Sequence, residues 1–104
     1  MWGTTLRIIM GSLVFRIRRN YFEAIVRGEK QTEFRKASKF WRKRIEGKGE
    51  SLNTAVFICG RDVHRRQILM IQEIQTPDWF SNQGKKDVDT LTCFAIHLGK
   101  VILK

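Results

Sequence analysis

The first clear pattern in the chain is an alternation of apolar and polar residues. Leu13, Phe15 and Ile17 are apolar, and Arg16 stands between the last two. Alternation with a period of two is typical of a strand that buries one face. The sequence therefore predicts a half-buried strand over residues 13–17.

The next segment changes to a helical period, with apolar side chains at Tyr21, Phe22, Ile25 and Val26. Asn20 precedes this run and is a residue type that caps helix N-termini. Gly28 follows it at the position where a left-handed residue commonly ends a helix. We expect a helix that begins after Asn20 and ends at Gly28.

A second strand and a second helix follow in the same half of the chain. Residues 31–36 read as a strand that turns Phe34 toward the core. Ser38 is a candidate cap for a short helix from Lys39 to Ile45, which carries Phe40 and Trp41.

The second half of the chain is dominated by apolar runs that predict strands. Residues 54–59 are almost wholly apolar, as in a central strand, and a turn at residues 60–62 follows. Further strands are expected over residues 65–75 and 92–98, the latter continuing through residues 101–103 past Gly99. Residues 78–89 read as a loop with a helical turn.

These elements give five to six strands and two short helices, both helices lying in the first half. At 104 residues the chain corresponds to one domain. Many short strands in a small basic domain favour an α+β fold built on a partly closed β-barrel. We expect the domain over residues 13–104, with residues 1–12 as a leader or an extra strand.

Positive charge is concentrated in one third of the chain. The net charge is +10, and residues 16–48 hold twelve Lys and Arg against four Glu, a net of 12 − 4 = +8. Residues 49–104 hold seven against six, a net of +1. Clustered positive charge favours a polyanionic partner, with nucleic acid first, although a solvated basic face is the alternative.

The cysteines argue against a disulfide framework and a zinc site. Cys59 and Cys93 lie in apolar runs with no short-range Cys or His partner, as small buried hydrophobes do. Their pattern fits a reducing, cytoplasmic location. No apolar run is long enough to span a bilayer, and we expect a monomer that needs no metal or cofactor and binds no membrane.

Charged residues just after the first predicted helix form the pattern Gly-x-Lys-x-x-Glu-x-Arg, at Gly28, Lys30, Glu33 and Arg35. Because Glu33 and Arg35 are two residues apart, they point to the same face of a strand. Such a group indicates a site. The alternative is an ion pair that only holds the barrel, although exposed pairs contribute just about 0–1 kcal/mol.

This motif, preceded by an apolar strand and a helix, resembles the signature of the activating signal cointegrator homology (ASCH) domain. That family has a β-barrel similar to the PUA RNA-binding domains, and the resemblance covers most of the chain in element order. It implies a PUA-like barrel with a cleft for RNA or a nucleotide-like ligand. Lys30, Glu33 and Arg35 would line the cleft, and Gly28 would form its turn.

The resemblance also implies an alternative, an enzyme acting on RNA or on modified nucleosides. Acetylcytidine amidohydrolases of this superfamily use a Lys and a Thr in the motif region and a later Glu. This chain keeps Lys30, has Glu33 at the Thr position, and offers Asp87 and Asp89 in the later region. For ribonuclease chemistry, Glu33 would be the base, Lys30 the acid or charge stabiliser, and Arg35 the phosphate ligand.

Aromatic residues among cations suggest the rim of this cleft. Trp41 lies beside Lys43 and Arg44, a combination that single-stranded nucleic acids favour, although Phe40 or Trp41 could instead anchor the helix. Which of the two faces outward is left open by the sequence.

Two further groups of residues are candidates for ligand contacts. Trp79 and Phe80 precede Lys85, and this loop would either clamp the cleft or plug the barrel end. Arg61 near the predicted turn is a phosphate contact or a solvated charge, as are the neighbouring arginines. Those arginines should keep His64 neutral.

The sequence thus predicts a domain that binds RNA, other single-stranded nucleic acid or a modified nucleoside. The residues chosen for the site are Lys30, Glu33, Arg35, Trp41, Lys43, Arg44, Arg61 and Lys85.

Overall fold

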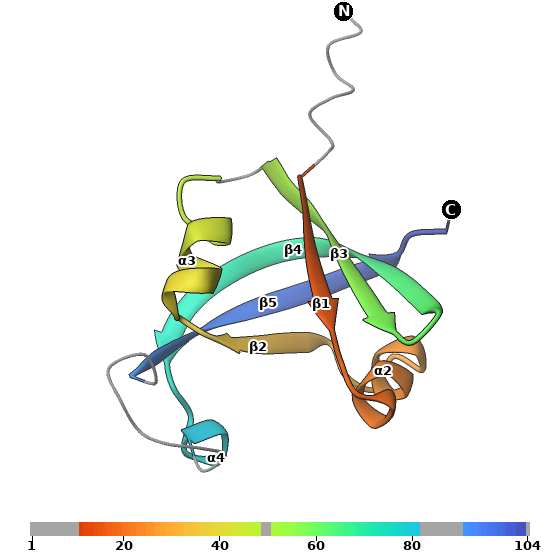
Figure 1. Ribbon diagram of the computed structural model, residues 1–104, viewed down its shortest axis with the longest axis horizontal. Coiled ribbons are helices and arrows are strands. Elements are labelled where there is room, and N and C mark those ends of the chain that lie inside the picture. The colour runs from red at the N-terminus through yellow and green to blue at the C-terminus, as the bar shows by residue number, and fades with distance from the viewer. Residues whose placement is uncertain (1–10, 49–50, 82–90, 104) are drawn as a thin grey trace, which may run out of the picture.

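The computed structural model describes residues 11–48, 51–81 and 91–103, which form a small α+β fold (Figure 1). Its strands are β1 (Gly11–Arg16), β2 (Thr32–Lys36), β3 (Leu52–Cys59), β4 (Asp62–Gln75) and β5 (Thr92–Val101). Its helices are α2 (Arg19–Val26), α3 (Lys39–Ile45) and α4 (Asp78–Ser81).

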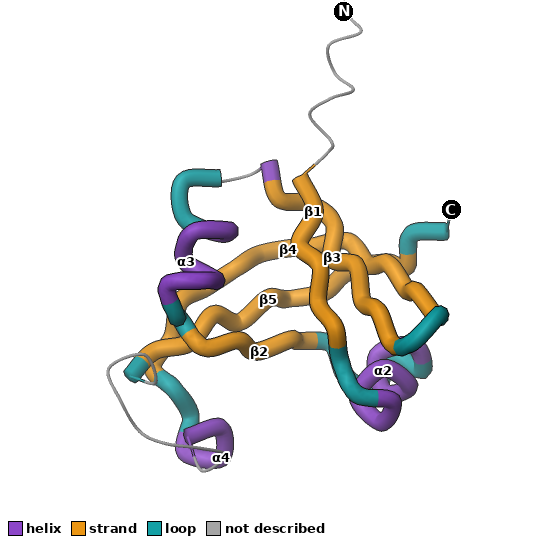
Figure 2. The backbone as a smooth tube through the Cα atoms, viewed as in Figure 1, coloured by secondary structure: helices purple, strands orange, loops and turns teal. Residues whose placement is uncertain are grey.

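The strands form one mixed sheet in the order β1-β3-β4-β5-β2. β1 runs parallel to β3, and every other neighbouring pair is antiparallel. The sheet curves into a half-barrel, so that its two terminal strands, β1 and β2, come round toward each other (Figure 2). This confirms the α+β class and the partly closed barrel in coarse outline.

The core fills the inside of the half-barrel. Phe15 on β1 stacks on Phe57 of β3, with ring centroids 5.2 Å apart, and both side chains are fully buried. Phe94 and Ile96 complete it from β5. Strand alternation brings these apolar positions to one face, as the period-two pattern predicts.

Helix α2 covers one end of the half-barrel and buries Phe22 and Ile25, which are one helical turn apart. It begins at Arg19 with Arg18 as its N-cap, so the predicted cap at Asn20 is wrong. The end of the helix is confirmed, because Gly28 has a φ of 82°. Glycine adopts this left-handed conformation without the steric cost of a Cβ.

Strand β2 corrects a second prediction. Phe34 does not enter the core; its ring packs against Trp79, with centroids 5.1 Å apart. Glu33 is the buried residue of this strand, 5% exposed. The face of β2 that turns inward therefore carries the charged motif residues, and the apolar residue lies on the other face.

Helix α3 agrees with its prediction. The Ser38 hydroxyl accepts a hydrogen bond from the Trp41 amide at 3.4 Å, and Ile45 is buried at the other end. The short α4 adds a third helical segment to the two that we expected, at the predicted helical turn.

The later strands are longer than predicted. β3 begins at Leu52 and β4 at Asp62, and β5 continues through Gly99 without a break. The irregularity that we expected at Gly99 is confirmed, because two residues along β4, from Arg66 to Ile68, oppose three along β5, from Val101 to Leu98. A second shift follows between Ile68 and Met70, where the extra residue lies on β4. Gly60, with a φ of 62°, forms the turn between β3 and β4.

β1 begins at Gly11, and residues 1–10 of the predicted leader or extra strand lie outside the described residues. Cys93 is fully buried and Cys59 partly so, and both are free thiols. Among the described residues, no helix has both the length and the apolar character that a membrane crossing requires.

Candidate nucleic-acid interface

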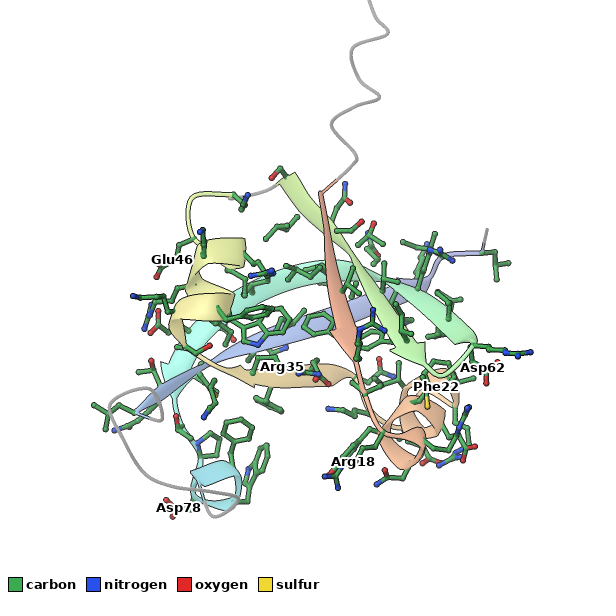
Figure 3. All side chains as sticks on the ribbon, viewed as in Figure 1. Arg18, Phe22, Arg35, Glu46, Asp62 and Asp78 are labelled. Atoms are coloured by element: carbon green, nitrogen blue, oxygen red, sulfur yellow. The ribbon has the colours of Figure 1, made fainter. Side chains whose placement is uncertain are left out.

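A cleft of about 490 Å³ opens where the two terminal strands face each other. One wall is the end of β1 with the start of α2, from Arg16 to Tyr21, and the other is β2 from Glu33 to Lys36. Consecutive β2 residues line the cleft, so it runs along the free edge of that strand. Figure 3 labels Arg35 on β2 and Arg18 beside α2 on these two walls.

Glu33 lies at the centre of the cleft floor between two cations. Its Oε2 accepts a hydrogen bond from Arg35 Nε at 2.7 Å, and its Oε1 lies 3.2 Å from Lys30 Nζ. The structure therefore brings the three predicted motif residues together. The Lys30 and Arg35 side chains remain about a quarter exposed, at 23% and 25%, so each also borders the cleft.

The guanidinium of Arg35 also connects the two terminal strands of the half-barrel. Its Cζ lies 5.2 Å from the ring centroid of Phe15 on β1 and 5.4 Å from that of Trp41 on α3. Phe15 and Trp41 stack on each other at 5.1 Å. Cation–π contacts thus link β2 to β1 in place of backbone hydrogen bonds.

Three more cations border the cleft, namely Arg16, Arg18 and Lys36. Their side chains are exposed, and among the described residues none of them forms an ion pair. By contrast, Arg19 pairs with Asp62 at 2.8 Å. Positive charge that no described carboxylate pairs with is therefore concentrated at this opening, where it would attract an anion.

Aromatic side chains form most of the rest of the cleft surface, together with Ile17 and Ser38. Tyr21 contributes from α2 and Trp41 from α3, while Phe34, Trp79 and Phe80 form a row of edge-to-face contacts. Trp79 is 53% exposed, so it lies on the wall of the cleft and does not plug the barrel. Flat apolar surfaces beside cations are suited to a planar, charged ligand.

The backbone of β2 also presents polar groups to the cleft. Gln31 accepts a hydrogen bond from the Leu98 amide, and Ala37 donates one to Thr92. In an antiparallel pair the bonding direction alternates, so residues 32, 34 and 36 direct their N–H and C=O groups away from β5. Lys30 Nζ binds the C=O of Thr32 at 2.7 Å, which leaves the Phe34 and Lys36 groups facing the opening.

The turn that carries Lys30 is held by a buried arginine that sequence reasoning placed elsewhere. Arg66 is 5% exposed and donates to the carbonyl oxygens of Gly99 at 2.6 Å and Ile25 at 3.2 Å. It also donates to Gln31 Oε1 at 2.9 Å, while Gln31 Nε2 donates to the Gly28 carbonyl at 2.7 Å. Arg66 was expected as a phosphate contact or solvated charge, and that expectation is wrong.

Burial lowers the pKa of Arg66 and of the nearby His64. Burial, and then the charge of Arg66, lower the pKa of His64. The expected direction for His64 is confirmed, but burial is the larger cause. The spacing of polar residues in the sequence does not identify Arg66 as a buried residue. Its three acceptors come from parts of the chain that only the fold brings together.

The remaining predicted site residues lie in three places. Trp41 is in the cleft, and Phe40 next to it is the exposed member of the pair. Lys43 and Arg44 are exposed on α3, outside the cleft lining, and Arg61 lies at the turn between β3 and β4. Lys85 lies outside the described residues. Sequence reasoning missed Arg16, Arg18, Lys36 and Tyr21 as cleft residues.

No protein-family model, curated protein or solved structure matches this chain. The described residues contain no group of three or more side chains that could hold a metal ion. The groups that the cleft presents are cations, aromatic rings and the free edge of β2.

Proposed function

We propose that this protein is an RNA- or nucleotide-binding domain of the ASCH type with a PUA-like barrel. The observation that carries the proposal is the cleft itself, in which Arg16, Arg18 and Lys36 lack a carboxylate partner among the described residues and stand beside exposed aromatic rings. Cations take the phosphate and rings stack on the base in single-stranded nucleic acid recognition.

The free edge of β2 supports the same proposal. A nucleobase has donors and acceptors side by side on its edge, and the N–H and C=O of Phe34 form a matching pair that faces the cleft. A base that lies between Trp41 and Trp79 would reach this edge. The backbone would then select the base, and the surrounding cations would add affinity that does not depend on sequence.

The motif supports the ASCH assignment by its order and its contacts. An apolar strand and a helix precede it, Gly28 forms a turn, and Lys30, Glu33 and Arg35 come together at the cleft. A cytoplasmic location belongs to the same proposal, supported by the two free cysteines.

We place binding ahead of catalysis because both oxygens of Glu33 are engaged. A general base must come within hydrogen-bonding reach of the proton that it removes, and Glu33 is only 5% exposed. Here one oxygen accepts from Arg35 at 2.7 Å and the other lies 3.2 Å from Lys30. The carboxylate therefore acts first as the group that holds two cations in place.

A pair of charge-matched double variants tests the proposal. Arg18→Ser with Lys36→Ser removes two cations from the cleft. Arg65→Ser with Lys100→Ser removes two exposed cations elsewhere, on β4 and β5. We expect the cleft variant to raise the Kd for a uridine-containing RNA oligonucleotide about tenfold or more, since each lost phosphate contact weakens binding.

The control variant should bind like the wild type, because it keeps the cleft and has the same net charge as the cleft variant. Fluorescence anisotropy at one fixed salt concentration gives both Kd values. An equal loss of affinity in the two variants would show that only the overall charge matters, and the cleft would then not be the binding site.

A further inference from the structure

The outer face of α3 presents a second flat surface beside the cleft. Phe40 is 53% exposed, and the Cζ of Arg44 lies 3.6 Å from its ring centroid. Arg44 Nη1 also donates to the Phe40 carbonyl at 3.2 Å, which fixes the guanidinium over the ring. One face of this guanidinium covers Phe40, and the other faces away from it. We call these two side chains the Arg44–Phe40 stack.

Helix α3 holds this stack in a defined position. On its opposite side Arg42 donates to Glu73 on β4 at 2.6 Å and to Glu46 at 2.6 Å, and the two carboxylates raise the pKa of Arg42. Ile45 is buried in the core. A platform fixed in this way loses little conformational freedom when a ligand binds.

Cations without a carboxylate partner surround the stack. Within the part of the chain that the structure describes, Lys39, Lys43 and Arg44 form no ion pair. Lys39 and Lys43 are four residues apart, so they lie on the same side of the helix. Lys36 at the cleft precedes them in the chain.

Trp41 connects the stack to the cleft. Its ring lines the cleft and packs on Phe15, while its neighbour Phe40 meets it edge-to-face at 5.0 Å. The aromatic surface thus continues from the inside of the cleft to the outer face of α3, with lysines beside it at both ends.

We propose that the partner is single-stranded RNA, with one base in the cleft and the next on the exposed face of the Arg44–Phe40 stack. The intervening phosphates would lie against Lys36, Lys39 and Lys43. Bases stack on arginine planes in such complexes, and in a duplex they are not available for this contact. This inference rests on the proposed function of the cleft, and it identifies the partner as a polymer and not a free nucleotide.

The dependence of affinity on RNA length tests the inference. Fluorescent oligouridylates from one to about eight nucleotides long are titrated with the full-length protein. We expect the Kd to fall roughly tenfold or more as the RNA becomes long enough to reach α3, because each stacked base adds affinity. The same oligonucleotide annealed to its complement should bind more weakly.

The variants Arg44→Ala and Arg44→Lys test whether the dependence of affinity on RNA length comes from the Arg44–Phe40 stack. We expect Arg44→Ala to raise the Kd of the octanucleotide about tenfold and to leave that of the mononucleotide unchanged. Arg44→Lys keeps the charge but removes the plane, so it should show most of the same loss. Arg65→Ala, which removes an exposed arginine on β4, is the control and should bind both ligands like the wild type.

Three results would overturn the inference while leaving the cleft proposal intact: equal affinity for one and eight nucleotides, equal affinity for duplex and single strand, or equal behaviour of Arg44→Ala and Arg65→Ala. Failure of both the mononucleotide and the oligonucleotides to bind would instead contradict the proposed function. Melting temperatures of the variants confirm that each remains folded.

Discussion

Glu33 is buried between Lys30 and Arg35, and its charge compensates both cations at once. A carboxylate in this position is favourable only because its hydrogen bonds replace those lost to water. If the carboxylate is removed, Lys30 and Arg35 remain close together without a shared counter-ion. The stability of the domain and the shape of the cleft floor therefore depend on the same residue.

We expect Glu33→Gln to lower the free energy of unfolding by about 1–3 kcal/mol, below the figure for a fully buried pair because both partners are partly exposed. Urea unfolding measures this. Glu46→Gln removes a carboxylate that is 55% exposed and paired with Arg42, and it should cost only about 0–1 kcal/mol. A Glu33→Gln variant as stable as the wild type that has lost a ribonuclease activity would make Glu33 catalytic and contradict the structural role.

Some of these residues could be predicted from the sequence and others could not, and the difference has a physical reason. Glu33 and Arg35 are recognisable because a period of two places them on one strand face. Phe34 was assigned to the core because it is apolar, but β2 is a terminal strand whose inner face borders the cleft. Arg66 looked like one more surface cation, and its acceptors become visible only in three dimensions.

A glycine with a positive φ follows both α2 and α3, although the C-cap of α2, Arg27, is helical and that of α3, Glu46, is extended. The two glycines allow an effect on stability to be separated from an effect on binding. Gly28 follows α2 and Gly47 follows α3, both with a φ of 82°. A Cβ at Gly28 would come no closer than 3.8 Å to another atom, and one at Gly47 would meet nothing within 4 Å. The cost of a side chain at either position is therefore conformational and not steric crowding.

We expect Gly28→Ala and Gly47→Ala each to lower the free energy of unfolding by about 1–2 kcal/mol. Only Gly28→Ala should also weaken RNA binding, by several-fold, because the turn at Gly28 positions Lys30. Thermal unfolding and anisotropy titrations measure the two effects. If Gly47→Ala weakens binding as much as Gly28→Ala, the turn at Gly28 has no special part in the cleft.

Element existence was easier to predict than element pairing. Helices α2 and α3 and the five strands of the described residues were located because their sequence patterns are local. The order β1-β3-β4-β5-β2 was not, since it depends on which distant segments share hydrogen bonds. That order determines where the candidate site lies, because it leaves β1 and β2 as the two edge strands between which the cleft opens.

Over the whole molecule, the net charge of +10 overstates the charge that a ligand meets. Among the described residues five cations form ion pairs, namely Arg19, Arg27, Lys30, Arg35 and Arg42. Others, such as Arg65 and Lys100, lie outside the cleft lining. Within residues 11–48, 51–81 and 91–103, the cations near the cleft that form no ion pair are Arg16, Arg18 and Lys36, joined on α3 by Lys39, Lys43 and Arg44. The sequence predicted that positive charge is concentrated in one third of the chain. Only the ion pairs of the structure show which of the described cations have no carboxylate partner.

This distribution predicts how salt affects RNA binding. If each of these cations neutralises one phosphate, the slope of log K against log salt for an octanucleotide should be about −4, at about −0.7 per contact. The slope should stay near that value for a much longer single strand, measured with RNA in excess, because the remaining cations are paired or lie elsewhere. The mononucleotide, with a single phosphate, should give a slope of about −1 or less. A slope that keeps steepening with RNA length would mean that the whole charged surface takes part, and the cleft with the outer face of α3 would then not define the binding site.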